Sequence, residues 1–106
     1  MKRKRKRSPW ERLKSGPCIT VPLHFFREFP KGQAILLAYL AGLDTDEEGW
    51  AVCPSEQIED DLDMSAAIQT RLLKWLEEWE YLEIARAGFP AQRHVKVDIQ
   101  ALASQR

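Results

Sequence analysis

Apolar residues recur with helical spacing in two consecutive stretches between residues 53 and 79. In the first stretch, Ser55 can cap a short helix whose inward residues are Ile58 and Leu62. In the second stretch, Ser65 can cap a longer helix. Its apolar residues gather on one side: Ile68, Leu72, Leu73, Trp75, Leu76 and Trp79. Because only a short joint separates the two capped helices, the pattern predicts a helix-turn-helix.

One further helix and three strands complete the predicted domain. The helix runs from Pro30 to Leu43 and turns an apolar stripe toward the core. A short strand is predicted at Trp50 to Cys53, and two longer ones at Tyr81 to Ala87 and Arg93 to Ile99, joined by a turn. A helix, a helix-turn-helix and a closing hairpin in this order make up a winged helix. The sequence therefore predicts an α+β, mainly α fold: a winged helix-turn-helix with three core helices and a C-terminal β-hairpin wing.

The N-terminal part of the chain has a different composition from the predicted domain. Residues 1–8 contain the run KRKRKR, which is too charged and too poor in apolar residues to pack, and we expect a disordered basic tail. Residues 9–17 are predicted to form a linker with a short helix from Pro9 to Ser15, since Ser8 to Glu11 has a capping-box arrangement. The main domain is predicted at 18–103, beginning with a short edge strand at Cys18 to Leu23.

Charge is distributed unevenly between these parts. The chain has sixteen basic and sixteen acidic residues and no net charge. Six of the basic residues are Lys2 to Arg7, which leaves ten basic against sixteen acidic residues, a formal charge of −6, in the rest of the chain. A basic tail is thus attached to an acidic body.

Several function classes find no support in the sequence. No apolar run approaches the roughly 20 residues of a membrane span, and the basic N-terminus lacks the apolar stretch of a signal peptide, so we expect a cytoplasmic protein, nucleoid-associated if bacterial, without membrane contact. Cys18 and Cys53 stand alone and are expected to be reduced and buried. Without a phosphate-binding glycine loop, HExxH or a Ser, His and acid set, we expect no enzyme activity, cofactor or metal.

From about Ile19 to Leu102 the chain resembles the winged helix-turn-helix domain of plasmid and phage replication initiators and related bacterial DNA-binding proteins. The resemblance rests on a set of short matches: ITVP at Ile19 to Pro22, the helix at Ala34 to Leu43, Gly49 to Ser55, Met64-Ser65, and Arg71, Leu73, Leu76 and Leu82. It implies a DNA-binding protein that acts in replication initiation or transcription control.

The chain departs from the family pattern at four positions. Ala66 and Ala67 stand where the family usually has polar or basic residues for DNA. Gln69 replaces a small aliphatic residue, and Glu80 occupies the place of the customary turn glycine.

The residues predicted to contact DNA form three groups. If the second helix of the motif enters a major groove, its outward residues face bases and phosphates: Ser65, Ala66, Ala67, Thr70, Arg71 and Lys74. The hairpin is expected to present a positive cluster around its turn: Arg86, Arg93, His94 and Lys96. The tail adds affinity for phosphates that does not depend on sequence: Lys2, Arg3, Lys4, Arg5, Lys6 and Arg7.

Each group also has a simpler explanation. Arg71 and Lys74 could pair with Glu77 or Glu78 one helical turn away. The hairpin charges could serve solubility alone. The tail could act as a nuclear address, bind RNA, or fold over the acidic body.

An acidic cluster in the first helix of the motif supports an alternative function: Glu56, Glu59, Asp60, Asp61 and Asp63. The simplest interpretation is a solvated helix face. A functional one is a protein-interaction surface inside a nucleoprotein complex, with the tail on DNA or RNA. Trp75 and Trp79 are expected in the core, with a homodimer seam as the other possibility.

Overall fold

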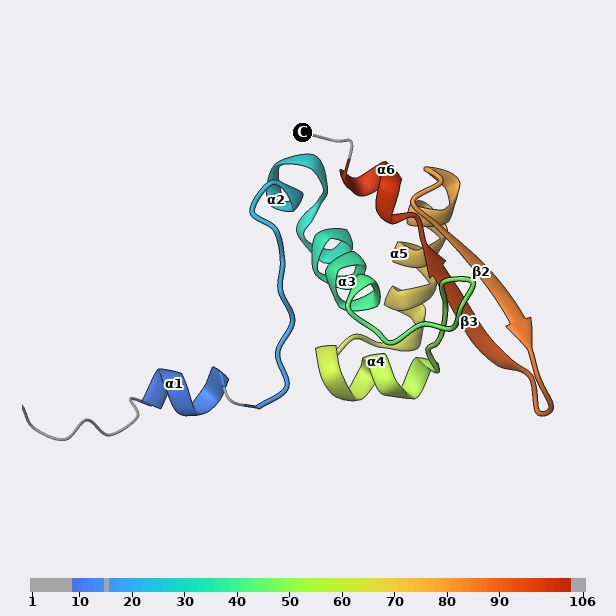
Figure 1. Ribbon diagram of the computed structural model, residues 1–106, viewed down its shortest axis with the longest axis horizontal. Coiled ribbons are helices and arrows are strands. Elements are labelled where there is room, and N and C mark those ends of the chain that lie inside the picture. Colours follow the sequence, from blue (N-terminus) through green and yellow to red (C-terminus); the bar gives the residue numbers. More distant parts are fainter. Residues whose placement is uncertain (1–8, 15, 104–106) are drawn as a thin grey trace, which may run out of the picture.

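Three helices of seven or more residues and a C-terminal antiparallel hairpin make up the body of the chain in the computed structural model, which describes residues 9–14 and 16–103 (Figure 1). The fold is α+β and about half helical. The tail predicted at residues 1–8 lies outside the described residues.

The helices are α1 (Pro9–Lys14), α2 (Phe25–Glu28), α3 (Lys31–Ala41), α4 (Ser55–Leu62), α5 (Ala66–Glu78) and α6 (Ile99–Ala103). The strands are β1 (Trp50–Val52), β2 (Leu82–Ala87) and β3 (Gln92–Val97). The predicted long helices, the tandem pair and the hairpin are confirmed, with ends that differ by about two residues at most. The short helices α2 and α6 were not predicted.

The strand predicted at Cys18 to Leu23 does not form. Proline lacks the N–H that a strand ladder needs, and the carbonyl of Pro22 instead accepts a hydrogen bond from the Phe25 amide at 3.0 Å. That bond closes a turn which leads directly into α2. The segment therefore crosses the surface as irregular chain.

The three strands form one antiparallel sheet in the order β1-β3-β2. Side chains alternate between its two faces. Leu82 and Val95 are buried on the face that packs against the helices. Lys96 lies on the other face, in register with Trp50 and Glu83. This alternation decides which hairpin charges can lie together.

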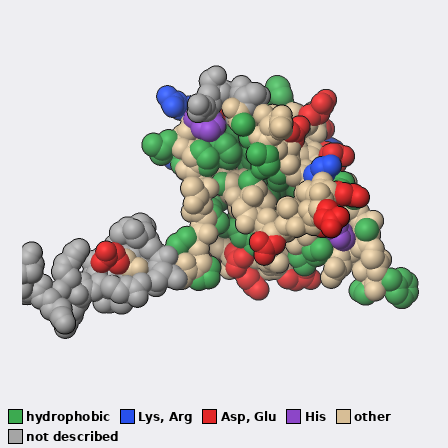
Figure 2. Space-filling model, viewed as in Figure 1, with side chains coloured by type: hydrophobic (Ala, Val, Ile, Leu, Met, Phe, Trp, Pro, Cys, Tyr) green, Lys and Arg blue, Asp and Glu red, His purple; other side chains and the backbone are tan. Residues whose placement is uncertain are grey.

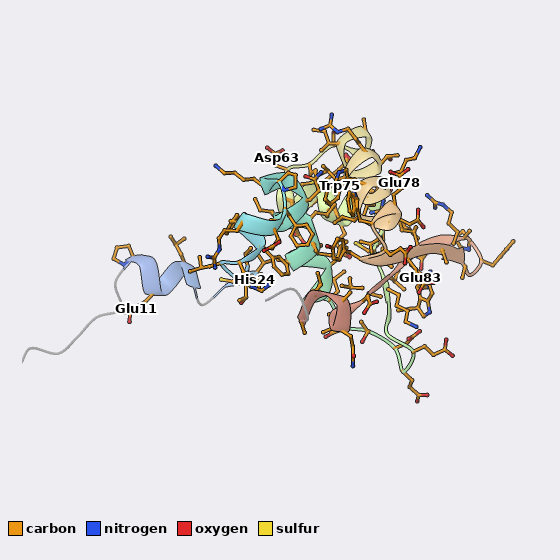
Figure 3. The ribbon with its side chains drawn as sticks, turned by 90° about the horizontal axis from the view of Figure 1, so that it is seen from above. Glu11, His24, Asp63, Trp75, Glu78 and Glu83 are labelled. Atoms are coloured by element: carbon orange, nitrogen blue, oxygen red, sulfur yellow. The ribbon has the colours of Figure 1, made fainter. Side chains whose placement is uncertain are left out.

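The core is built mainly from α3 and α5, which face each other across the body (Figure 1). Its largest fully buried apolar side chains come from helices, the sheet and the segment before α4: Leu36, Leu37, Leu40, Ile58, Leu76, Val95 and Cys53. Trp75 also points inward and contacts the Phe29 ring edge-on at 6.3 Å between centroids (Figure 3). The prediction of a core position is confirmed for Trp75 but wrong for Trp79, which is 62% exposed. Cys53 is buried as expected, whereas Cys18 is exposed.

The two serines predicted as caps behave differently. Ser65 is the N-cap of α5, and its Oγ accepts a hydrogen bond from the Ile68 amide at 3.3 Å. Ser55 is not a cap: Pro54 holds that position in α4, and Ser55 is the first helical residue. Its Oγ is enclosed and has no hydrogen-bond partner in the described part of the chain.

Ser65→Ala should lower the free energy of unfolding by about 1 kcal/mol, because one amide of the first turn of α5 loses its acceptor. Ser55→Ala is the matched control and should lower it little or not at all, since the Ser55 hydroxyl has no partner to lose. Urea denaturation followed by tryptophan fluorescence measures both. Equal losses in the two variants would contradict the assignment of the cap.

Two turns that border α4 and α5 use left-handed backbone. Asp63 ends α4 with φ of 54°, and Glu80 follows α5 with φ of 64°. Aspartate visits this region fairly often, whereas glutamate does so at a cost. Glu80 thus adopts a conformation that glycine would adopt without a steric penalty.

Glu80→Gly should raise the free energy of unfolding by about 0.5 to 1 kcal/mol, because glycine carries no steric penalty at positive φ. Glu78→Gly, inside the exposed last turn of α5, should lower it by about 1 kcal/mol. Thermal and urea unfolding of the two variants should therefore shift in opposite directions. A loss of stability in Glu80→Gly would show that the Glu80 side chain contributes more than its backbone strain costs.

Candidate nucleic-acid interface

The exposed face of α5 carries the residues that the sequence places outward. Ala66, Ala67, Thr70, Arg71 and Lys74 are all exposed. The opposite face is buried through Gln69, Leu72, Leu73 and Leu76. The predicted division into an inward and an outward face is therefore confirmed, except that Ile68 is 40% exposed although it was expected to face the core.

Arg71 and Lys74 keep their charges available. Within residues 9–14 and 16–103, neither side chain lies within 4 Å of a carboxylate, and the pairing with Glu77 or Glu78 considered above is not formed. Glu78 points outward from the same helix (Figure 3). An arginine and a lysine one turn apart thus offer two unneutralised cations to a ligand.

The side-chain hydroxyls of Thr70 and of the N-cap Ser65 already form hydrogen bonds with backbone groups of α5. The Ser65 Oγ serves the N-cap of α5. The Thr70 hydroxyl donates to the Ala66 carbonyl at 3.0 Å. Thr70 therefore retains only acceptor capacity toward outside groups, and the cations supply the donors on this face.

The hairpin does not present one positive cluster. Arg86 and Arg93 are register partners on β2 and β3 and share the inner face of the hairpin, whereas His94 and Lys96 lie on the outer face. The Lys96 ammonium stands over the Trp50 ring at 5.9 Å from its centroid. His94 Nδ1 lies 3.0 Å from the Gln92 carbonyl oxygen. The expected clustering of these four residues around the turn is therefore wrong.

Arg93 does not lie on the surface, contrary to the sequence-based expectation. Only 9% of the residue is exposed. Its Nε donates to the Cys53 carbonyl at 2.8 Å, and its Nη2 donates to the Gln69 Oε1 at 3.0 Å. Strand alternation explains the burial, because Arg93 falls on the same face as Val95 and Val97. Arg93 joins the hairpin to α5 and to the segment before α4.

Gln69 completes this connection, which we call the Gln69–Arg93 latch. The Gln69 side chain is fully buried, and its Nε2 donates to the carbonyls of Ser55 at 3.0 Å and Met64 at 2.8 Å. Every polar atom of the amide therefore has a partner. The latch fixes α4, α5 and the hairpin relative to one another, and it was not predicted from the sequence. The available signal was a polar side chain at an inward position of an otherwise apolar stripe.

Comparison of the chain with protein-family models, with curated proteins and with solved structures finds no match.

The acidic residues of α4 and its C-cap form one exposed surface: Glu56, Glu59, Asp60, Asp61 and Asp63. Acidic side chains are visible along the lower edge of the body, where α4 lies (Figure 2). Asp61 is tied to the core helix α3, because the Tyr39 hydroxyl donates to its carboxylate. The Gln57 Nε2 donates to the same hydroxyl at 3.0 Å. Burial and the hydrogen bond to Asp61 raise the pKa of Tyr39 to about 12, so Tyr39 remains a donor at neutral pH.

The described residues give little support for metal binding, for a membrane-spanning helix or for a nucleophilic thiol. Among residues 9–14 and 16–103, no three His, Cys, Asp or Glu side chains come together in a way that could hold a metal ion. No helix in this part of the chain has the length and apolar character that crossing a membrane requires. Burial raises the pKa of the Cys53 thiol, although Arg93 acts in the opposite direction, so the thiol is a poor nucleophile at neutral pH.

Proposed function

We propose that the chain is a non-enzymatic winged helix-turn-helix protein that binds double-stranded DNA. In this proposal α4 and α5 are the helix-turn-helix, α5 enters the major groove, and the β2–β3 hairpin is the wing. The biological role that fits best is replication initiation or transcription control, which follows the sequence resemblance described above.

The observation that carries the proposal is the exposed face of α5. Arg71 and Lys74 project from it without carboxylate partners among the described residues, and small side chains precede them at Ala66 and Ala67. Small residues let a helix approach base edges closely, and an alanine methyl can contact the thymine methyl. The two cations can then bond guanine edges or phosphates.

The other basic residues have different proposed contributions. Arg86 is exposed on the inner face of the hairpin, near the start of α4, and supports docking there. Arg93 contributes by position, because the latch sets the angle between α5 and the hairpin. The six basic residues at 2–7 add salt-sensitive affinity without sequence preference.

Mapping by NMR tests this docking. Addition of a short duplex to the isotope-labelled full chain should shift the amide signals of residues 65–74 and of the β2–β3 hairpin, with little change in α2 and α6. Shifts confined to residues 2–7 would mean that the folded body does not dock on DNA, and the proposal would then be abandoned.

A second function is favoured by one specific observation, the exposed acidic surface of α4. Under this alternative the surface receives a basic protein within a nucleoprotein complex, while the tail contacts DNA or RNA. Pull-down from lysate with and without nuclease separates the two functions, because a direct protein partner survives nuclease treatment. A partner that survives should be lost when Glu59, Asp60 and Asp63 are replaced by their amides, and a partner that persists would reject the acidic surface as its site.

A further inference from the structure

A cleft of about 420 Å³ lies between the amino-terminal end of α4 and the inner face of the β2–β3 hairpin. Pro54, Ser55 and Glu56 line it from the helix. Arg86, Arg93 and the hairpin turn line it from the other side. The cleft adjoins the latch, since Arg93 and the Ser55 carbonyl both bond to Gln69 of α5.

The hairpin side of the cleft carries two positive charges that form no ion pair within the described residues. Arg86 and Arg93 are direct register partners, and like charges at such positions repel each other. The acceptors of Arg93 are the neutral oxygens of Cys53 and Gln69, so its charge is not neutralised. Among the described residues, no carboxylate lies within 4 Å of either guanidinium. A bound anion would remove the repulsion between the two arginines.

The helix side of the cleft offers unused donors. The Ser55 Oγ is enclosed without a hydrogen-bond partner in the described part of the chain. A buried hydroxyl in this state calls for a physical reason, and an ion or ligand is one. Ser55 is also the first residue of α4, whose N-cap, Pro54, provides no side-chain bond. Amides at such a helix end point outward and favour negative charge.

We propose that this cleft binds one phosphate group, held by the guanidinium groups of Arg86 and Arg93 and by the hydroxyl and first-turn amides at Ser55. Guanidinium forks match phosphate oxygens in geometry and charge. The inference rests on the proposed function for its source of phosphate, which is a backbone phosphate of the bound duplex. Glu56 lines the same cleft and opposes an anion, so it limits the affinity.

The experiment titrates the full chain with inorganic phosphate and, separately, with a short duplex. Chloride at matched ionic strength serves as the reference. The readouts are the NMR signals of the Ser55 and Glu56 amides and of the Arg93 Nε–H group. Three variants accompany the parent chain: Arg86→Gln, Glu56→Gln, and Lys96→Gln, which removes one positive charge from the opposite face of the same hairpin.

Phosphate should shift these signals saturably, and chloride should not. Arg86→Gln should weaken phosphate binding about tenfold, the equivalent of one lost charge-assisted hydrogen bond. Glu56→Gln should tighten it, and Lys96→Gln should change it by no more than about twofold, because that charge is distant and screened. Equal shifts with chloride, or equal losses in Arg86→Gln and Lys96→Gln, would overturn the site.

The duplex titration identifies the source of the phosphate. If the duplex moves the same signals and Arg86→Gln weakens its binding, the cleft holds a backbone phosphate. If phosphate saturates the cleft but the duplex binds without moving these signals, the assignment to DNA is overturned although the proposed function stands. If phosphate binds and the duplex does not bind at all, the proposed function fails and the phosphate site remains.

Discussion

Arg93→Ala should lower the free energy of unfolding by about 3 kcal/mol. This is the largest loss of stability that we expect from the substitution of any charged residue. The substitution removes two hydrogen bonds, to the Cys53 carbonyl and to Gln69 Oε1, and leaves both acceptors enclosed. It also removes the aliphatic stem of a residue that is only 9% exposed. Urea denaturation followed by tryptophan fluorescence measures the loss.

Arg86→Ala is the matched control for Arg93→Ala, because it removes the register partner of Arg93 from the same face of the hairpin. Arg86 is exposed, and its loss should change stability by no more than about 0.5 kcal/mol. A double-mutant cycle of Arg93→Ala with Gln69→Ala should give a coupling of at least about 1 kcal/mol. Independent effects of the two substitutions would contradict the latch.

Arg71→Ala combined with Lys74→Ala should weaken binding of duplex DNA roughly 100-fold at moderate salt, or about tenfold for each lost contact. The slope of log affinity against log salt should also become shallower by about 2, since each phosphate contact contributes about 0.9. Both residues are exposed, so the variant should fold like the parent chain. Fluorescence anisotropy with a labelled duplex measures both quantities.

The control for this pair loses the same two charges elsewhere. Arg27→Ala with Lys31→Ala removes two exposed cations from α2 and the start of α3. If α5 docks on the duplex, the control pair should reduce affinity only through net charge, by a few-fold at most. Equal losses of affinity in the two double variants would mean that duplex binding depends on the total charge of the chain and not on the exposed face of α5.

Most of the framework could be predicted because the long elements repeat their apolar residues over several turns. The tandem pair and the hairpin each have a period that a sequence displays clearly. The helix at Lys31–Ala41 was also predicted, but it buries every residue from Leu36 to Leu40 and not a single apolar stripe. The helices α2 and α6 have four and five residues, which is too short for such a period to appear. The strand predicted at Cys18 to Leu23 does not form because its residue types favour a strand, whereas Pro22 lacks the N–H that a ladder needs.

The exposure of a site residue could be predicted where it follows from helical periodicity. It could not be predicted where it depends on hydrogen-bond partners that are distant in sequence. Arg71 and Lys74 lie outward because the buried residues of α5 fix the helix rotation. Arg93 was assigned to the surface by its residue type, although strand alternation places it among inward positions. A buried arginine requires acceptors, and its acceptors come from residues 24 and 40 positions away in sequence. Local pattern cannot show such a contact.

The latch also connects stability to function. Gln69 lies one residue before Thr70 on α5, and Arg93 lies on the hairpin strand next to Arg86. Loss of the latch should therefore disturb the spacing between the α5 face and the hairpin even in molecules that remain folded. The acidic surface of α4 is compatible with duplex binding when DNA contacts α5 and the hairpin while the carboxylates of α4 stay in solvent.

The proposed function requires that the folded body, and not only the basic tail, binds duplex DNA. The most direct test replaces all six residues from Lys2 to Arg7 by serine in the full chain and measures duplex binding across a salt series by fluorescence anisotropy. We predict weaker binding that still falls with salt and falls further in Arg71→Ala with Lys74→Ala. Complete loss of binding in the serine-tail variant at low salt would contradict the claim and would direct attention to a protein partner for the acidic surface of α4.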